Sequence, residues 1–286
     1  MIINPLNTVI ATQIIDFKST KGSGPIQIID TEDNIYFAKT TDLFGFPNSE
    51  MICEVLGIYF AKLWGLNVAE PCLVQIPRSI IEDYLSIEGN TLPSRYKNTD
   101  FENTLFFGSQ EVEDTVEIEQ YIKGLTLRKE FNLFSQPLDL IKLGIMDMWL
   151  GNKDRMPKNP NILLTTSFND KFDFVPIDHA ACLGYQREYK KINSSHLNIL
   201  DNESILSSGL AKTILKFSNK CDLMLLPNKI NDCFTECLDN SNFILEQIPS
   251  EWGFSKKAKE NIIFVLSEAE RNKMLSTAFI RFMPKK

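Results

Sequence analysis

Between residues 8 and 40, hydrophobic and polar positions are arranged as in a series of short β-strands. Three segments, 8–17, 26–30 and 35–39, are rich in β-branched and aromatic residues, and a glycine-bearing loop and a turn-forming run separate them. This pattern predicts a twisted antiparallel β unit whose last strand ends in Lys39.

The pattern then changes from strand-like to helical. Apolar residues recur at helical spacing through residues 48–65, and Gly65 marks the end of the predicted helix. A turn and a strand are predicted for residues 65–76. Residues 78–115 have no clear period, so they are predicted to form an insertion or an irregular edge.

The rest of the chain is predicted to be mainly helical, apart from one β-hairpin. Residues 114–124 indicate a strand that bends from one part of the molecule into the other, and residues 162–164 and 172–177 predict the hairpin. Helical spacing recurs in residues 125–131, 137–151, 204–218, 228–242 and 255–275. The predicted fold class is α+β, with a small β-rich part, residues 1–120, and a larger, mostly helical part, residues 121–286.

The composition fits an ordinary globular protein and argues against several classes. The chain has 286 residues and a net charge of −7, which argues against a general binder of nucleic acid or of anionic membranes. No apolar run reaches the roughly 18 residues of a membrane span. Residues 1–17 lack the basic region of a signal peptide, and the cysteines show no CxxC pair. We therefore expect a cytoplasmic protein without a transmembrane segment or direct nucleic-acid contacts.

The strongest chemical signal lies in two polar loops that flank the predicted hairpin. The first loop contains Asp154, Asn159 and Asn161, and the second begins at Asp178, after a run of β-formers. Because a hairpin brings its two ends together, these side chains are expected to lie side by side. A base, an amide ligand and a metal carboxylate in this order are typical of a phosphoryl-transfer site of the protein-kinase type.

Each of these side chains has a predicted role and a simpler alternative. Asp154 is expected to accept or orient the acceptor hydroxyl, while Asp178 and either Asn159 or Asn161 hold Mg²⁺. The alternative is that these residues cap turns and bond their own backbone. An earlier Asp–x4–Asn pair, Asp147 with Asn152, begins inside a predicted helix, so the later pair is the preferred candidate.

The candidate nucleotide-binding residues lie mainly in the β-rich part. A flexible loop whose backbone can approach phosphates closely contains Gly22, Ser23 and Gly24. Lys39 is the candidate for the α- and β-phosphates, and either Glu50 or Glu54 on the predicted helix could hold its ammonium group. The backbone expected to meet the adenine edge is that of Glu119, Gln120, Tyr121 and Ile122.

Together these stretches resemble the HipA-like kinases and, more distantly, the phosphatidylinositol 3- and 4-kinases. The resemblance covers most of the chain and is carried by KGSGPIQI, FAK, CEVLGIYFAKLWGLNVAEP, FFGS, GNKDRMPKNPNILL and FVPIDHA. It implies a bilobal protein-kinase-like fold, ATP with Mg²⁺, Asp154 as the catalytic aspartate and Asp178 as a metal ligand. It also implies that Glu54 rather than Glu50 is the partner of Lys39.

The resemblance leaves two questions open. The five-residue spacing selects Asn159 as the amide ligand, whereas the Asn-Ile-Leu context selects Asn161. Many HipA-like proteins are bacterial toxin kinases that phosphorylate Ser or Thr of a protein and have an antitoxin partner, so a protein substrate and a regulatory partner protein are expected. The alternatives are a lipid kinase, which the basic and aromatic residues 185–191 would permit, and a pseudokinase that docks a partner.

Overall fold

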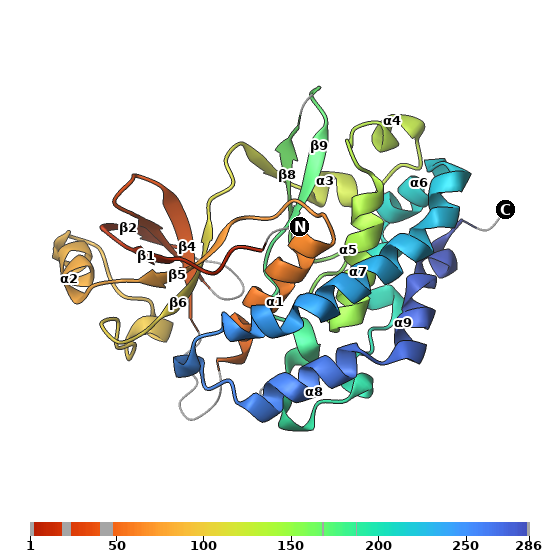
Figure 1. Ribbon diagram of the computed structural model, residues 1–286. Helices are drawn as coiled ribbons and strands as arrows, with labels where there is room; N and C mark the ends of the chain where they lie inside the picture. The colour runs from red at the N-terminus through yellow and green to blue at the C-terminus, as the bar shows by residue number, and fades with distance from the viewer. Residues whose placement is uncertain (1–2, 19–23, 41–47, 168, 187, 285–286) are drawn as a thin grey trace.

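The computed structural model describes residues 3–18, 24–40, 48–167, 169–186 and 188–284 of the chain. Two β-sheets and a group of helices follow one another across the molecule (Figure 1). A six-stranded sheet lies at one end, a three-stranded sheet lies near the middle, and most helices lie at the other end. The predicted α+β composition, with strands first and helices later, is confirmed.

The six-stranded sheet is formed by the first half of the chain. Its strands are β1 (Thr8–Ile10), β2 (Gln13–Phe17), β3 (Ile26–Ile29), β4 (Ile35–Lys39), β5 (Pro71–Gln75) and β6 (Phe106–Gln110). They follow the order β1-β5-β6-β4-β3-β2, in which only the β1–β5 pair is parallel. Helix α2 (Arg78–Ser86) packs beside this sheet, against β2.

The segment 8–17, which the sequence predicts as one strand, forms two strands at opposite edges of the sheet. The chain divides at Ala11 and Thr12, whose N–H groups donate to carbonyls on the two edges, those of Gln75 and Ile29, at 2.9 and 2.8 Å. The sheet therefore curls until its edges approach each other. Local composition could not reveal this division, because strand-forming residues run through it without a turn signal.

The predicted insertion, residues 78–115, contains a strand that was missed. Strand β6 pairs with both β4 and β5, so it lies in the interior of the sheet. Phe106, Phe107 and Gly108 are all buried, and a Cβ at Gly108 would come within 2.4 Å of the Val74 side chain. A strand buried on both faces does not alternate in polarity, which explains why the period was not visible.

Helix α1 (Ser49–Leu63) confirms the predicted helix and joins the two parts of the molecule. It lies between the six-stranded sheet and the later helices (Figure 1). All but two of its residues are buried, and Phe60 packs against Trp149 with ring centroids 5.3 Å apart. Gly65, at φ +68°, follows the end of the helix in a left-handed conformation that suits glycine. Because both faces of α1 are covered, its side chains have fixed positions relative to both sheets.

The second sheet contains the predicted hairpin. Its strands are β7 (Thr115–Glu117), β8 (Ile162–Thr166) and β9 (Phe172–Pro176), paired antiparallel in that order. Since β7 pairs with β8, this sheet begins upstream of the predicted division between residues 120 and 121.

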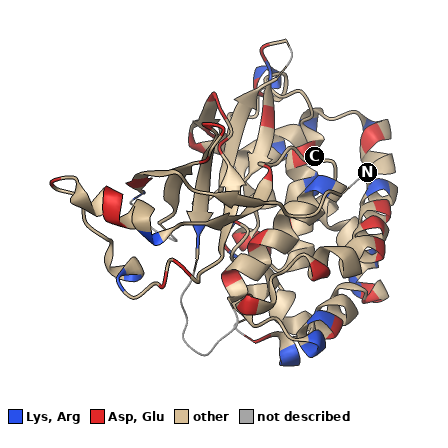
Figure 2. Cartoon of the chain, turned by 60° about the vertical axis from the view of Figure 1, so that its left-hand side comes forward, with Lys and Arg blue, Asp and Glu red and all other residues tan. Residues whose placement is uncertain are grey.

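Helices surround the second sheet and fill the larger part. They are α3 (Glu119–Ile122), α4 (Arg128–Phe131), α5 (Leu138–Leu150), α6 (Gly209–Phe217), α7 (Lys220–Glu246), α8 (Lys256–Leu266) and α9 (Ala269–Ser276). The predicted helical segment 255–275 is thus two helices rather than one, with the break at Ser267 and Glu268. Acidic and basic residues are mixed along the outer helices (Figure 2). None of the helices in the described ranges combines the length and apolar character that a membrane crossing requires.

Candidate active site

Lys39 and two carboxylates meet where the two sheets approach each other. The Nζ of Lys39, at the end of β4, lies 2.9 Å from the Oε1 of Glu54 on α1. It also lies 3.4 Å from the Oδ1 of Asp178, which follows β9. Of the two glutamates left open by the helix pattern, Glu54 forms the ion pair with Lys39. Strand, helix and hairpin each contribute one of these charged groups.

The charges of this trio depend on one another. Burial alone lowers the pKa of Lys39, but the carboxylates of Glu54 and Asp178 outweigh it and raise that pKa above its usual value. Burial raises the pKa of Glu54, and the ammonium group of Lys39 opposes that rise. Lys39 therefore carries a positive charge at neutral pH. The Lys39 side chain is only 13% exposed.

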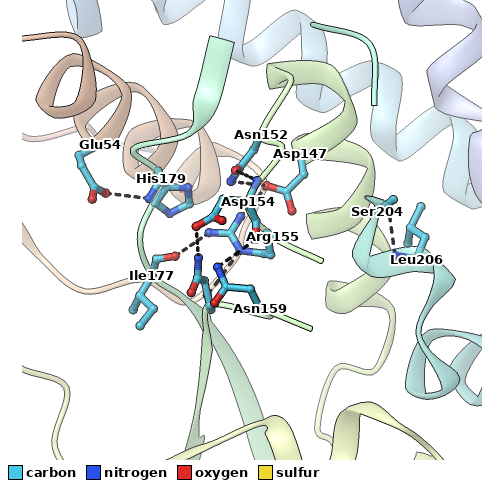
Figure 3. Close-up of polar contacts among 11 residues, drawn as sticks. Glu54, Asp147, Asn152, Asp154, Arg155, Asn159, Ile177, His179, Ser204 and Leu206 are labelled. Atoms are coloured by element: carbon cyan, nitrogen blue, oxygen red, sulfur yellow. Dashed lines mark hydrogen bonds and ion pairs between the residues drawn. The ribbon is translucent and has the colours of Figure 1, made fainter. Parts of the chain in front are cut away.

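Glu54 is also tied to the loop that carries Asp178. Its Oε2 accepts a hydrogen bond from the backbone N–H of His179 at 2.9 Å (Figure 3). The approach of helix and loop depends on Gly57, because a Cβ there would lie 2.3 Å from the Cβ of His179. The His179 ring is buried, and this burial lowers its pKa well below the usual value, so the ring is neutral. Asp178 itself has a φ of +56°, a conformation that asparagine and aspartate tolerate better than most residues.

Asp154 is held by both asparagines that the sequence proposed. The Nδ2 of Asn161 donates to the Oδ2 of Asp154 at 3.1 Å, and the Nδ2 of Asn159 donates to the Asp154 carbonyl at 3.2 Å. Figure 3 shows Asn159 and Asp154 beside each other in this loop. Each asparagine uses its amide nitrogen in these bonds, so each keeps its amide oxygen for another ligand. The geometry brings both candidates to the site and does not select one.

A buried network that the sequence did not identify fixes the same loop. Arg155 is fully buried, and its guanidinium donates to Asp147 at 2.5 Å and to the carbonyl of Ile177 at 2.7 Å. Asp147 also accepts from Asn152 at 3.1 Å, and Asn152 in turn accepts from the N–H of Asp154 at 3.2 Å (Figure 3). The earlier Asp–x4–Asn pair, Asp147 with Asn152, therefore fixes the loop through hydrogen bonds. Its signal was an aspartate at a helix position with apolar neighbours on every side.

These groups surround one cavity of about 1030 Å³ between the two sheets. The predicted site residues that line it are Lys39, Glu54, Asp154, Asn159, Asn161 and Asp178. Residues more than a hundred positions apart in the sequence therefore face a common space. A cavity of this size with a few convergent polar groups is the usual form of a small-molecule site.

The glycine loop can be followed only in part. Gly22 and Ser23 lie outside the described residues. Gly24 has a φ of +51°, and its carbonyl accepts a hydrogen bond from the hydroxyl of Tyr96 at 2.8 Å. Lys18 and Pro25, which flank the loop, both line the cavity. The described ends of the loop thus reach the site.

The predicted adenine-contacting segment does not line the cavity. Glu119, Gln120, Tyr121 and Ile122 form the short helix α3, where Glu119 and Gln120 are exposed. Tyr121 turns instead toward Phe172, with ring centroids 5.7 Å apart, and Ile122 is buried. The cavity wall is formed upstream, by β6 and the connection to β7, through Ser109, Gln110, Val112 and Glu117. Contact of residues 119–122 with adenine stays a prediction, and strand β6, which the sequence missed, carries the chain out of the first sheet.

A family model and two solved structures match the chain. A model of the HipA-like kinase family matches residues 13–279 of the chain. The structure is similar to that of a Helicobacter pylori proinflammatory kinase, CtkA, with a TM-score of 0.54 and 15% identity over 96% of this chain and 98% of that one. It is also similar to the Golgi casein kinase with Mn and ADP bound, with a TM-score of 0.50 and 12% identity over 94% of this chain and 74% of that one.

No curated protein sequence matches the chain. At identities of 15% and 12%, the two structural similarities establish a kinase-like fold and nothing finer.

Proposed function

Because the chain belongs to the HipA-like kinase family, we propose that it transfers the γ-phosphoryl group of ATP to a Ser or Thr hydroxyl of a protein. The observation that carries this proposal is the meeting of Lys39, Glu54, Asp154 and Asp178 around one cavity. A kinase contributes little covalent chemistry of its own, so catalysis rests on positioning and charge neutralisation. The lysine, the glutamate and the two aspartates of this cavity are residue types that phosphoryl transfer requires.

Lys39 would hold the α- and β-phosphates. Its raised pKa keeps it charged at neutral pH, and Glu54 fixes its direction through a bond of 2.9 Å. Glu54 is in turn bonded to the His179 backbone, so the lysine is positioned relative to the loop that carries Asp178. The chain thus keeps a cation at a fixed distance from the proposed metal carboxylate. This arrangement matches the Lys–Glu pair that protein kinases require.

The oxygen donors of the cavity suit Mg²⁺. Asp178, Asn159 and Asn161 offer one carboxylate and two amide oxygens, and hard divalent cations prefer oxygen ligands. When bound, the ion would neutralise charge on the phosphate oxygens. The two asparagines also orient Asp154, so they would couple the metal side of the site to the acceptor side.

Asp154 would receive the acceptor. Its carboxylate lines the cavity, and its Oδ2 accepts a hydrogen bond from Asn161 at 3.1 Å. The other oxygen can accept the proton of a substrate hydroxyl. The buried Asp147–Arg155 pair lies beneath it and would keep this carboxylate from turning away.

We further propose that β6 and the connection to β7 contact the adenine. Ser109, Gln110 and Val112 line the cavity where this connection leaves the first sheet. Residues 1–120, apart from β7, would then form the nucleotide-binding lobe, and residues 121–286 the catalytic lobe. The net charge of −7 leads us to expect no direct nucleic-acid contacts. We also propose a cytoplasmic location and, from membership of the HipA-like family, a regulatory partner protein.

The test is phosphoryl transfer from radiolabelled ATP with Mg²⁺ to casein, alongside phosphoinositide vesicles. We expect label in the protein acceptor. Asp154→Ala and Asp178→Ala should each lower the rate at least 100-fold, since losing one electrostatic group at a transition state costs about 3–4 kcal/mol. Asp232→Ala removes an exposed carboxylate from α7 and should leave the rate unchanged.

Each other outcome has a definite meaning. Label confined to the lipid would replace the protein acceptor by a phosphoinositide. Full activity in either Asp154→Ala or Asp178→Ala would refute the assigned roles. If ATP binds but its phosphoryl group passes neither to an acceptor nor to water, the chain is a pseudokinase.

A further inference from the structure

A tyrosine of the chain itself projects into the acceptor side of the cavity. Tyr185 lies seven residues after Asp178, at the end of the 3-10 turn Cys182–Tyr185. It lines the cavity together with Asp154 and Asp178, and it is 57% exposed, whereas Cys182 and Leu183 before it are buried. The turn is therefore anchored in the protein, while the tyrosine ring remains free to face the site.

The backbone that presents Tyr185 is strained and closely confined. Leu183, Gly184 and Tyr185 have φ values of 58°, 67° and 60°, so three consecutive residues adopt the left-handed conformation. A Cβ at Gly184 would lie 2.1 Å from the carbonyl oxygen of His196, and the Gly184 N–H donates to Gly151 at 3.1 Å. Strain of this kind persists only where the surroundings impose it, and it concentrates at functional sites.

The segment is also anchored beyond Tyr185. The hydroxyl of Tyr189 is buried and donates to the Ser49 carbonyl at the start of α1, at 2.9 Å. Cys53 of the same helix contacts the Tyr189 hydroxyl at 3.3 Å and donates to the Cys182 carbonyl at 3.1 Å. Helix α1 therefore holds the chain on both sides of Tyr185. The position of the Tyr185 ring follows from this anchoring.

The hydroxyl of Tyr185 bonds to the group proposed to receive the acceptor. It interacts with the Asp154 carboxylate, whose Oδ2 accepts a hydrogen bond from Asn161 at 3.1 Å. Burial, with the negative charges of Asp154, Asp178 and Glu50, raises the pKa of Tyr185, so the hydroxyl keeps its proton. A neutral hydroxyl bonded to a catalytic aspartate is the arrangement that a kinase gives its substrate before transfer.

We propose that Tyr185 is an acceptor of the γ-phosphoryl group, phosphorylated within its own molecule; this rests on the proposed function. In the step, the bond between the γ-phosphorus and the oxygen that bridges it to the β-phosphate of ATP breaks. A bond from the γ-phosphorus to the Tyr185 oxygen forms, the hydroxyl proton passes to Asp154, and ADP leaves. Until then, the ring fills the place that an external hydroxyl needs. The site would therefore modify itself before it accepts another substrate.

The modification would also clear the site. A phosphotyrosine carries a charge of about −1.5 to −2 at neutral pH. At Tyr185 it would face the carboxylates of Asp154, Asp178 and Glu50, which already lie near the hydroxyl. These negative charges repel one another, so the modified side chain would leave the acceptor side. An external substrate could then reach Asp154.

The experiment begins with phosphatase-treated full-length protein, incubated with radiolabelled ATP and Mg²⁺ and mapped by mass spectrometry. We expect close to one phosphate per chain at Tyr185, at a rate per molecule that does not change with protein concentration. Tyr185→Phe should lose this label, and Tyr84→Phe, a matched change beside the first sheet, should keep it. Casein phosphorylation by unmodified wild type should begin with a lag, and Tyr185→Phe, whose ring stays in place and cannot be modified, should remain slow throughout.

Mixing separates transfer within a molecule from transfer between molecules. Asp154→Asn protein incubated with wild type should stay unlabelled at Tyr185, and label there would overturn the proposal. Transfer to casein with no phosphate on Tyr185 would also overturn it, while leaving the proposed function intact. If wild type consumes no ATP and labels nothing, the proposed function fails, and this inference fails with it.

Discussion

At the scale of single residues, the contact between Lys39 and Glu54 is the most direct point to test. Glu54→Gln keeps the shape of the side chain but removes the charge that holds the ammonium group at 2.9 Å. A hydrogen bond to a charged group contributes about 1.5–3 kcal/mol, so kcat/KM for ATP should fall roughly 10- to 100-fold. Glu50→Gln, one turn earlier on the same helix, should have a much smaller effect. Equal losses in the two variants would contradict the pairing.

The buried Asp147 predicts a dependence of activity on pH. Burial raises its pKa to about 6, against the opposing charge of Arg155 and the bond from Asn152. As the pH falls through about 6, the carboxylate takes up a proton and loses its ion pair with Arg155, so the loop around Asp154 should lose its geometry. We expect transfer activity to decline across this range. Steady-state rates between pH 5 and 8 measure it.

The sign of the stability change distinguishes this loss from unfolding. Because the folded-state pKa of Asp147 lies above the ordinary value of 3.8, the folded state binds the proton more tightly between pH 3.8 and about 6. This group by itself makes the fold more stable, not less, as the pH falls through that window. Asp147→Asn should have low activity and lack the acid decline. An unchanged decline in that variant would assign it to another group.

At the scale of elements, the sequence predicted those helices and strands that have a regular local pattern. The helix at 48–65 and the hairpin around β8 and β9 were predicted because each keeps one clear period over its length. Strand β6 was missed because it is buried on both faces, and the 8–17 segment was misread because no turn signal marks the change of sheet edge. Both errors concern the pairing of strands that are far apart in the sequence, and a local pattern does not show such pairing.

The close approach of α1 to the loop that carries Asp178 and His179 can be tested at Gly57. In Gly57→Ala the new Cβ would lie 2.3 Å from the Cβ of His179, so helix and loop must separate. Overpacking of this kind costs about 1–3 kcal/mol, and separation should also lengthen the bond between Glu54 and the His179 N–H. We expect a lower midpoint of thermal unfolding together with a raised KM for ATP.

A second helical glycine provides the control. Gly144→Ala on α5 would place a Cβ 2.5 Å from the Leu206 side chain, away from the cavity. It should lower the unfolding midpoint while leaving the KM for ATP unchanged. If Gly57→Ala changes only stability, as Gly144→Ala should, the spacing of helix and loop does not control nucleotide binding.

At the scale of the whole molecule, the candidate site depends on distances that the sequence does not state. Lys39, Asp154 and Asp178 could be proposed together because the order of strands, helix and hairpin resembles that of known kinases. The wall near Ser109 and Gln110 could not, because its position depends on how the chain crosses between two sheets. Nor could the tyrosine beside Asp154, since its placement rests on a left-handed turn anchored by α1.

A cavity lined by both parts of the molecule predicts that nucleotide should stabilise them together. ATP with Mg²⁺ at 100 times its Kd should add about 2.7 kcal/mol to the free energy of unfolding, a rise of roughly 4–5 °C in the midpoint for a chain of this size. Lys39→Met should lose most of this rise, and EDTA should reduce it in wild type, because Asp178 is a proposed ligand of the ion. Hydrogen exchange should slow in β4 and β6 of one sheet and in β8 and β9 of the other. Protection limited to one sheet would mean that the nucleotide does not bridge the cavity.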